Sequence, residues 1–186
     1  MTSRERIVDE LLVLAAQAGQ IDAFERLAAR WHPRLLRHAR QLTGDAEGGR
    51  EAVQDAWVAI ARGLGRLDDP ARFGPWAFRI TGRRCGDWIE RRMRTRRHSA
   101  GIDEARDAPA TTDAPDDALA RARDALRRLD PERRALMAMF YIEGFSVAEI
   151  AQVLEISAGT VKSRLYRARE GLRAALEVRN GRAAGS

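Results

Sequence analysis

Cysteine and histidine are scarce in this sequence of 186 residues, and their scarcity excludes several kinds of site. Cys85 is the only cysteine, so an internal disulfide and a cysteine-rich zinc site are both excluded. The three histidines, His32, His38 and His98, do not have the spacing of metal ligands. No nucleophile paired with a base and no phosphate-binding glycine loop is evident. The sequence therefore predicts a protein without catalytic residues, cofactor or metal.

Long apolar stretches are also missing. No stretch approaches the roughly 18 apolar residues that a membrane-spanning helix needs. The first residues, MTSRERIVDELLVLAAQAG, are charged early, and their apolar part is short and interrupted, which argues against a signal peptide. We therefore expect no membrane insertion, and a protein of the reducing cytoplasm.

Lysine is nearly absent. Lys162 is the only lysine among the 33 lysine and arginine residues. The net charge is +6 and the pI is about 10.7, which favours a polyanionic partner. Arginine suits bidentate contacts with phosphate groups, although a GC-rich genome would produce the same excess of arginine. Apolar residues make up 45% of the chain, which is enough to form a hydrophobic core.

Helical periodicity dominates the chain, and no alternating strand pattern persists. The sequence therefore predicts an all-α fold. The segments TGD and DDPARFGP interrupt the pattern, and Gly82 and Gly86 weaken the helix that contains them. Apolar spacing predicts helices over residues 7–18, 22–42, 50–64, 76–93, 119–129, 131–143 and 147–154, and a last helix that runs through Leu176.

One segment differs from the rest in composition. Residues 99–117, SAGIDEARDAPATTDAPDD, are acidic and carry almost no large apolar side chain. Such a segment cannot bury enough surface to offset the entropy that it would lose on ordering. We therefore expect two small helical domains, residues 1–98 and 118–178, joined by a flexible acidic linker over 99–117 and followed by a disordered tail over 179–186.

The segment SVAEIAQVLEISAGTVKSRLYRARE, residues 146–170, has the layout of a helix-turn-helix. Ser146 and Glu149 fit a capping box, Ser157 fits an N-cap, and only EIS separates the two helices. The inward face of the second helix is apolar and consists of Val161, Leu165, Ala168 and Leu172. Its opposite and flanking faces are polar and mostly basic, and consist of Thr160, Lys162, Ser163, Arg164, Tyr166, Arg167 and Arg169.

The second helix of this motif enters the DNA major groove, where arginine and lysine reach guanine edges and flanking groups hold phosphates. The alternative is a solvated helical face that happens to be basic. The short turn, the two serine caps and the apolar stripe argue against that alternative. The motif therefore predicts DNA binding, but it does not separate repressors, activators and initiation factors.

Four motifs, taken in order, carry a resemblance to one family. They are AFERLAARWHPRLLRHARQLTGDAEGGREAVQDAWVAIARGL, then FGPWAFRITGRRCGDWIERRMR, then the acidic linker, then the helix-turn-helix. This order resembles the extracytoplasmic-function (ECF) sigma factors of bacterial RNA polymerase over about residues 23–176. The resemblance implies a non-enzymatic subunit that binds core polymerase at its clamp helices and flap and directs initiation on promoter DNA. It also implies control by an anti-sigma factor.

The resemblance implies three sets of site residues. The polymerase-binding set is Glu51, Gln54, Asp55 and Val58. The set that would recognise and melt the minus-ten element is Arg79, Arg83, Arg84, Asp87, Arg91 and Arg92. The set for the minus-thirty-five element is the outer face of the second helix, Thr160 to Arg169, named above. Arg83 stands where the family usually has asparagine, and Gly86 where it has a large aliphatic residue, so the unpaired base that is recognised stays open.

Two alternatives and one reservation accompany this interpretation. A helix-turn-helix regulator with an N-terminal ligand-sensing domain would share the C-terminal motif, but it would not need the arginine- and aromatic-rich segment 73–97. Within that segment Trp76, Ile80 and Trp88 have helical spacing, which favours core packing over base stacking. Cys85 could serve as a redox switch, but a lone cysteine on a helix is more often a small core residue.

Overall fold

The structure is a computed structural model, and it describes residues 3–98, 126 and 129–183. Across these residues the chain forms helices and no strand, which confirms the predicted all-α fold. The predicted linker and most of the predicted helix 119–129 lie outside the described residues. The elements are α1 (Ser3–Gln17), α2 (Ile21–Thr43), α3 (Ala46–Gly63), η1 (Leu64–Arg66), η2 (Pro70–Arg72), α4 (Phe73–His98), α6 (Pro131–Tyr141), α7 (Val147–Leu154) and α8 (Ala158–Ala183).

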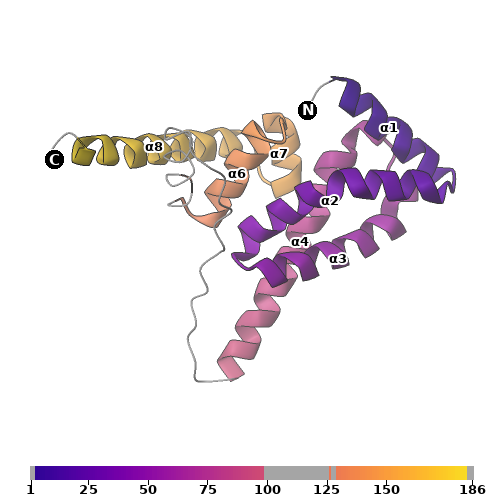
Figure 1. Ribbon diagram of the computed structural model, residues 1–186, viewed down its shortest axis with the longest axis horizontal. Coiled ribbons are helices and arrows are strands. Elements are labelled where there is room, and N and C mark those ends of the chain that lie inside the picture. Colours follow the sequence, from indigo (N-terminus) through magenta and orange to yellow (C-terminus); the bar gives the residue numbers. More distant parts are fainter. Residues whose placement is uncertain (1–2, 99–125, 127–128, 184–186) are drawn as a thin grey trace.

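Helices α1 to α4 form an N-terminal group in which α2, α3 and α4 pack against one another and α1 packs on α2 (Figure 1). Helix α3 begins at Ala46, earlier than the predicted start at 50, because Asp45 Oδ1 accepts a hydrogen bond from the Gly48 amide at 2.8 Å. The same glycine admits a close neighbour, since a Cβ there would lie 2.4 Å from the Trp88 ring. Because Gly48 and Gly49 occupy this first turn, the spacing of apolar residues did not reveal it.

Helices α6 to α8 form a C-terminal group whose helix starts follow the predicted caps. Asp130 Oδ1 accepts from the Arg133 amide at 2.8 Å ahead of α6. Ser146 and Glu149 form the predicted capping box, with bonds of 3.2 and 2.7 Å, and Ser157 Oγ accepts from the Thr160 amide at 3.1 Å. Helix α8 continues past its predicted end at Leu176 to Ala183.

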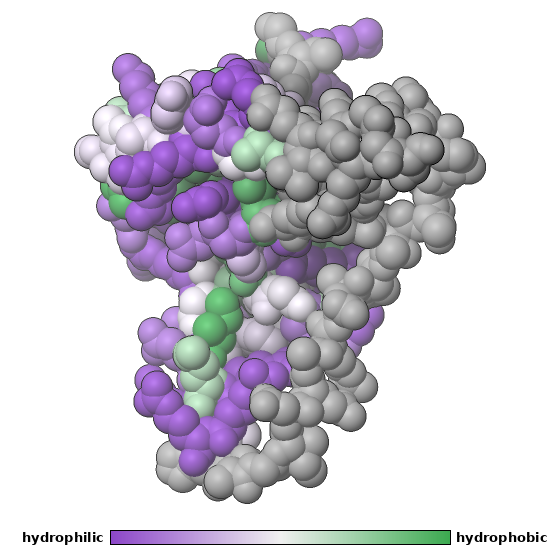
Figure 2. All heavy atoms as spheres, turned by 90° about the vertical axis from the view of Figure 1, so that its left-hand side faces the viewer, coloured by the Kyte–Doolittle hydropathy of each residue, from purple (hydrophilic) through white to green (hydrophobic). Residues whose placement is uncertain are grey.

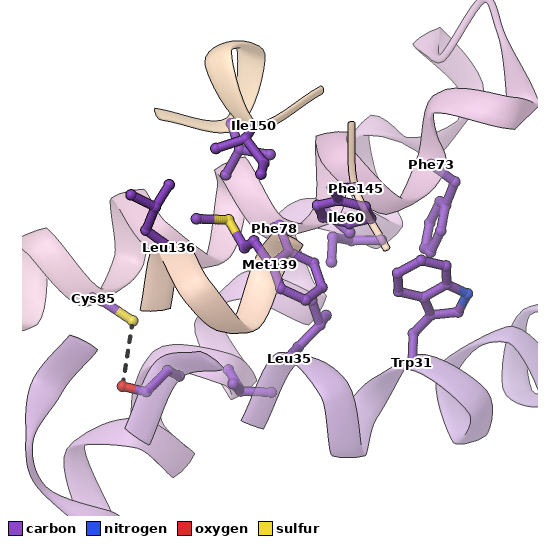
Figure 3. Packing of buried hydrophobic residues seen from close by; sticks show 14 of the residues in the cluster. Trp31, Leu35, Ile60, Phe73, Phe78, Cys85, Leu136, Met139, Phe145 and Ile150 are labelled. Carbon is purple, nitrogen blue, oxygen red and sulfur yellow. Dashed lines mark hydrogen bonds between the residues drawn. The ribbon is translucent and has the colours of Figure 1, made fainter. Parts of the chain in front are cut away.

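The buried residues of the two groups form a single cluster. Helix α2 packs on α6, and α4 packs on α7. Figure 3 shows Leu35 and Phe78 of the N-terminal group lying beside Met139 and Phe145 of the C-terminal group. The apolar spacing predicted each helix, but it did not predict this contact between the groups.

The C-terminal part of α4 projects away from the rest of the molecule (Figure 1). Seen from the side, this projection carries a short apolar band among hydrophilic residues (Figure 2), and Met93 on it is 55% exposed. Of the helices described, none combines the length and apolar character that a membrane span requires.

Candidate nucleic-acid interface

Helix α8 separates an apolar face from a polar one, as its sequence predicts. Val161, Leu165 and Ala168 are buried at 0%, 3% and 0% exposure and join the core. Lys162, Ser163, Arg164, Tyr166 and Arg167 are exposed on the other side. No ion pair links Lys162, Arg164 or Arg167 to any other residue that the structure describes. The outer face of α8 therefore presents cations that are available to an external anion.

The turn before α8 fixes the direction in which this face points. Glu155 closes α7 in the left-handed conformation, with φ of 55°, and the Ile156 amide donates to the Ala151 carbonyl at 3.1 Å. Thr160, which the sequence places in the minus-thirty-five set, has its hydroxyl 2.8 Å from that of Ser157. The turn and the caps thus hold the two helices of the motif at a fixed angle.

Arg169 differs from the other cations of α8. Its Nε donates to the Tyr141 hydroxyl at 2.7 Å, and its guanidinium lies 5.5 Å from the centre of the Phe140 ring. The structure therefore places Arg169 against α6, at the edge of the outer face, where it joins the helices as well as carrying charge.

The arginines predicted for the minus-ten element are mostly engaged within the protein. Arg84 pairs with Asp87 of the same helix at 3.1 Å. Arg92 bonds to Asp45 at 2.9 Å and lies over the Trp88 ring at 4.9 Å. These contacts join the middle and end of α4 to itself and to the start of α3.

Arg83 and Arg79 lie on the side of α4 that faces the C-terminal group. Arg83 forms an ion pair with Glu155 in the turn between α7 and α8. Arg79 is half-buried and lines a cleft between α4 and the C-terminal group, whose volume is given below. Arg83, one of the two residues that depart from the family pattern, therefore contacts the helix-turn-helix, and no sequence pattern indicated this contact.

The residues predicted to bind polymerase lie on the outer side of α3. Gln54 is exposed and Val58 is 48% exposed. Glu51 accepts from the Trp88 indole at 3.0 Å and from Arg91 at 3.2 Å, while Asp55 lies 3.6 Å from the same guanidinium. The structure thus brings two residues of the polymerase set together with Arg91 of the minus-ten set.

The aromatic and aliphatic side chains of α4 pack within the protein, as the sequence predicts. Trp76, Ile80 and Trp88 are all half-buried. Trp76 packs near Phe73 with ring centres 6.1 Å apart, and Trp88 covers Gly48. Phe78, which lies between them in sequence, is 1% exposed and belongs wholly to the core.

Three ionisable groups have pKa values shifted by their surroundings. The Gly48 amide, with Arg92 as a weaker partner, holds the pKa of Asp45 below its usual range. Burial lowers the pKa of His38 to about 4, although Glu143 acts in the opposite direction. Burial also raises the pKa of the Cys85 thiol to about 12, so the thiol stays protonated against the Ala39 carbonyl (Figure 3).

A cleft of about 910 Å³ lies between part of α4 and the C-terminal group, beside the place where α4 packs on α7. Arg79 and Arg83 line it from α4, and Arg164 and Arg167 line it from α8. The cleft thus brings together members of the two predicted DNA-binding sets. Within the described part of the chain, no three His, Cys, Asp or Glu residues are grouped so as to hold a metal ion.

Sequence reasoning missed the residues that join the two helical groups. Glu143 and Phe145 lie between α6 and α7 and are 3% and 4% exposed. A glutamate in a loop is ordinarily solvated, so nothing in the pattern marked it as buried. Only its position between Ile142 and Phe145, with Gly144 as the turning residue at φ of 71°, hints that this loop is packed.

Comparisons with known proteins agree over most of the chain. A family model described as Sigma-70 region 2 matches residues 27–95, and one described as Sigma-70 region 4 matches residues 119–172. The ECF RNA polymerase sigma factor SigM of Mycobacterium tuberculosis is 34% identical over 88% of this chain and 82% of its own length. The RNA polymerase sigma factor CarQ of Myxococcus xanthus is 30% identical over 83% and 90%.

Solved structures show the same arrangement. CnrH, in complex with the cytosolic domain of CnrY, superposes with a TM-score of 0.64 at 30% identity, over 92% of this chain and 98% of the other. The sigma factor RpoE of Bartonella quintana, in complex with the anti-sigma factor NepR, superposes with a TM-score of 0.67 over 83% and 97%, at 24% identity.

Proposed function

We propose how the residues of this chain share the work of initiation, from the premise that it belongs to the ECF RNA polymerase sigma factors, which bind core polymerase and direct promoter-specific transcription. Residues 1–98 would act as region 2 and residues 118–178 as region 4, with 99–117 as linker and 179–186 as tail. Both family models match, which supports this function over a regulator with an N-terminal ligand-sensing domain.

The outer face of α8 would recognise the minus-thirty-five element. The observation that carries this proposal is that Lys162 and Arg167 are exposed and form no ion pair with the described residues, while a capped and tight turn holds them opposite a fully buried Val161. Lys162, Ser163, Tyr166 and Arg167 would contact base edges in the major groove. Thr160, Arg164 and Arg169 would mainly position the helix on the phosphates.

Region 2 would supply the other two surfaces. Glu51, Gln54, Asp55 and Val58 on α3 would contact the polymerase, and the exposure of Gln54 and Val58 supports that role. The minus-ten element would be held by α4, through Arg79, Arg83, Arg84, Asp87, Arg91 and Arg92. Most of these arginines already have acidic partners, so DNA phosphates would have to replace carboxylates there.

The remaining proposals concern the partners and the setting. We propose that the chain catalyses nothing itself, acts in the cytoplasm and is held inactive by an anti-sigma factor. The similarity to CnrH, which is seen in complex with the cytosolic domain of CnrY, supports an inhibitory protein partner.

Run-off transcription with purified core polymerase on a genomic DNA library tests the central proposal. The wild-type chain should confer selective start sites that core polymerase alone lacks. Arg167→Ala or Lys162→Ala should cost about 1–3 kcal/mol at one promoter base and relax the preference at that position. Arg26→Ala, which removes one exposed cation from α2, is the matched control and should leave the preference unchanged.

Two outcomes would contradict the proposal at different levels. An equal loss on every DNA sequence would make Lys162 and Arg167 phosphate contacts and not base contacts. A wild-type chain that neither binds core polymerase nor confers selectivity would refute the function itself.

A further inference from the structure

Lys162 carries the only lysine amine of the chain, and this amine lies on the face of α8 proposed to read DNA. Every other residue among the 33 lysines and arginines is an arginine. A guanidinium stays protonated in proteins and is therefore a poor nucleophile, whereas a lysine amine reacts readily once it has lost its proton. The thiol of Cys85 is buried at 1% exposure. A reagent that transfers a group to lysine thus has a single side-chain target in this chain.

The structure leaves this amine accessible. Lys162 is exposed, and the neighbouring Val161 is buried at 0% exposure, so the helix turns the lysine side chain outward. Lys162 forms no ion pair or hydrogen bond with another residue that the structure describes. The cleft beside α4 is lined by Arg164 and Arg167 but not by Lys162. A small reagent can therefore reach the amine from solvent.

The surroundings of Lys162 are strongly cationic. Residues 158–169 carry four cations and no carboxylate. The acidic residues on either side, Glu155 and Glu170, are each paired with an arginine. A cluster of like charges of this kind raises the local concentration of anions. A small anionic reagent should therefore accumulate beside Lys162, and a neutral reagent should not.

We propose that Lys162 is a modification site that takes an acyl group from an acyl phosphate, and that acylation weakens recognition of the promoter. The amine gives one proton to water, and its nitrogen then attacks the carbonyl carbon of the acyl phosphate. The new N–C bond forms, the C–O bond to the phosphate breaks, and inorganic phosphate leaves with the electron pair. The second proton of the amine goes to water, and nothing is oxidised or reduced.

The effect on the promoter rests on the proposed function, whereas the reaction itself does not. The ammonium group of lysine has a full charge and three donors, and the amide that replaces it has no charge and one donor. It can no longer serve as a cationic donor to the two acceptors on a guanine edge. Preference for the base that Lys162 contacts should therefore fall about 5- to 150-fold.

A chain with its lysine moved elsewhere tests the reaction. The double variant Lys162→Arg/Arg26→Lys keeps one lysine and the wild-type net charge. Position 26 is exposed on α2, but it follows Glu25 directly and Asp22 by four residues. Acetyl phosphate at low salt should acylate Lys162 several-fold faster than the moved lysine, and high salt should reduce this difference. The neutral reagent N-acetoxysuccinimide should acylate both at similar rates. Mass spectrometry of the digested full chain measures each rate.

Run-off transcription tests the consequence. Each chain is treated with acetyl phosphate, freed of the reagent and then assembled with untreated core polymerase. On promoters that differ at single bases of the minus-thirty-five element, treated wild type should lose its preference at one base. The single variant Lys162→Arg and the double variant should each keep whatever preference they had before treatment. These two variants also control for acylation at any other amine.

The outcomes separate the modification site from the proposed function. Equal rates with acetyl phosphate at the two lysine positions in low salt would overturn the proposed site. Acylation of Lys162 that leaves the promoter preference of an active holoenzyme unchanged would overturn the proposed effect. If Lys162 is acylated as expected but not even the untreated chain confers selectivity on core polymerase, the proposed function fails and the modification site stands.

Discussion

The two helices proposed to contact DNA, α4 and α8, use their arginines in opposite ways. On α4, Arg84, Arg91 and Arg92 are paired with carboxylates of α3, α4 or the loop before α3. On α8, Arg164 and Arg167 have no such partner among the described residues. A helix whose sequence is basic can therefore either form ion pairs with neighbouring helices or present an exposed surface to a partner. Composition does not distinguish the two, because only the fold supplies the acidic partner.

The largest difference should appear in the cores beneath these helices. Trp31 is 1% exposed and contacts Phe73 at 5.3 Å and Phe78 at 6.4 Å, so Trp31→Ala should destabilise the chain by about 3–5 kcal/mol. Leu165→Ala, its counterpart in α8, should cost about 2–3 kcal/mol, because leucine is a smaller side chain than tryptophan and its removal leaves a smaller cavity. Urea unfolding followed by circular dichroism measures both. A shared core predicts one transition in each variant, and two separate transitions would break that expectation.

A second prediction concerns pH. Protonation of His38 in acid should destabilise the N-terminal group. The pKa is about 4 in the folded chain and near 6.5 when unfolded, so the unfolded chain binds more protons between these values. The contribution of neutral His38 to the free energy of unfolding should be fully present above pH 6.5. It should be lost as the pH falls toward 4, by on the order of 3 kcal/mol. Unfolding free energies at several pH values, for wild type and His38→Leu, isolate this contribution.

The control for this prediction is His32, which is exposed on the same helix. His32→Gln should retain the wild-type dependence on pH, whereas His38→Leu should flatten it. Equal slopes for wild type and His38→Leu would show that His38 is solvated or paired in solution, contrary to its burial at 3% exposure.

The contrast between the arginines themselves should be smaller. Arg92→Ala removes a bond to Asp45 and a contact with the Trp88 ring, and should cost about 1 kcal/mol of stability. Arg167→Ala removes no ion pair or side-chain hydrogen bond with the described residues and should stay within about 0.5 kcal/mol of wild type. Thermal unfolding of the two variants compares them directly. If both variants lose the same amount of stability, the arginines of α8 also hold helices together, and the contrast between α4 and α8 disappears.

The smallest effect is expected at Cys85. Its thiol is buried at 1% exposure, with a pKa raised to about 12, so it should not react with an alkylating reagent in the folded chain. Mass spectrometry after treatment, with and without urea, checks this. Rapid alkylation of the native chain would revive the redox interpretation.

The sequence predicted local structure well and contacts between distant segments poorly. The caps at Asp130, Ser146 and Ser157 are visible because they depend on residues three or fewer positions apart. The start of α3 was missed because Gly48 and Gly49, which lower helix propensity, occupy its first turn. Gly48 leaves room for the Trp88 ring, and Gly49 leaves room for Arg40. The pairing of Glu143 with Arg34 joins residues far apart in sequence, and a single chain gives no periodicity that would reveal it.

The candidate site divides in the same way. The polar face of α8 follows from a repeat within one helix, and the burial of Val161 opposite it agrees with that prediction. The α4 and α3 residues were assigned only through the family resemblance. That assignment could not foresee that Arg91 would lie between Glu51 and Asp55, because such a cluster depends on how two helices cross.

All four tryptophans lie before residue 89, and the guanidinium of Arg34 sits 4.0 Å from the centre of the Trp31 ring. A cation held that close to an indole perturbs its emission, and Arg34 keeps this position while it also binds Glu143. The protein thus carries an intrinsic fluorescent side chain, Trp31, at the contact between its N-terminal and C-terminal groups. Separation of the two helical groups should change the share of the tryptophan fluorescence that comes from Trp31, and this change can be followed without attaching a dye.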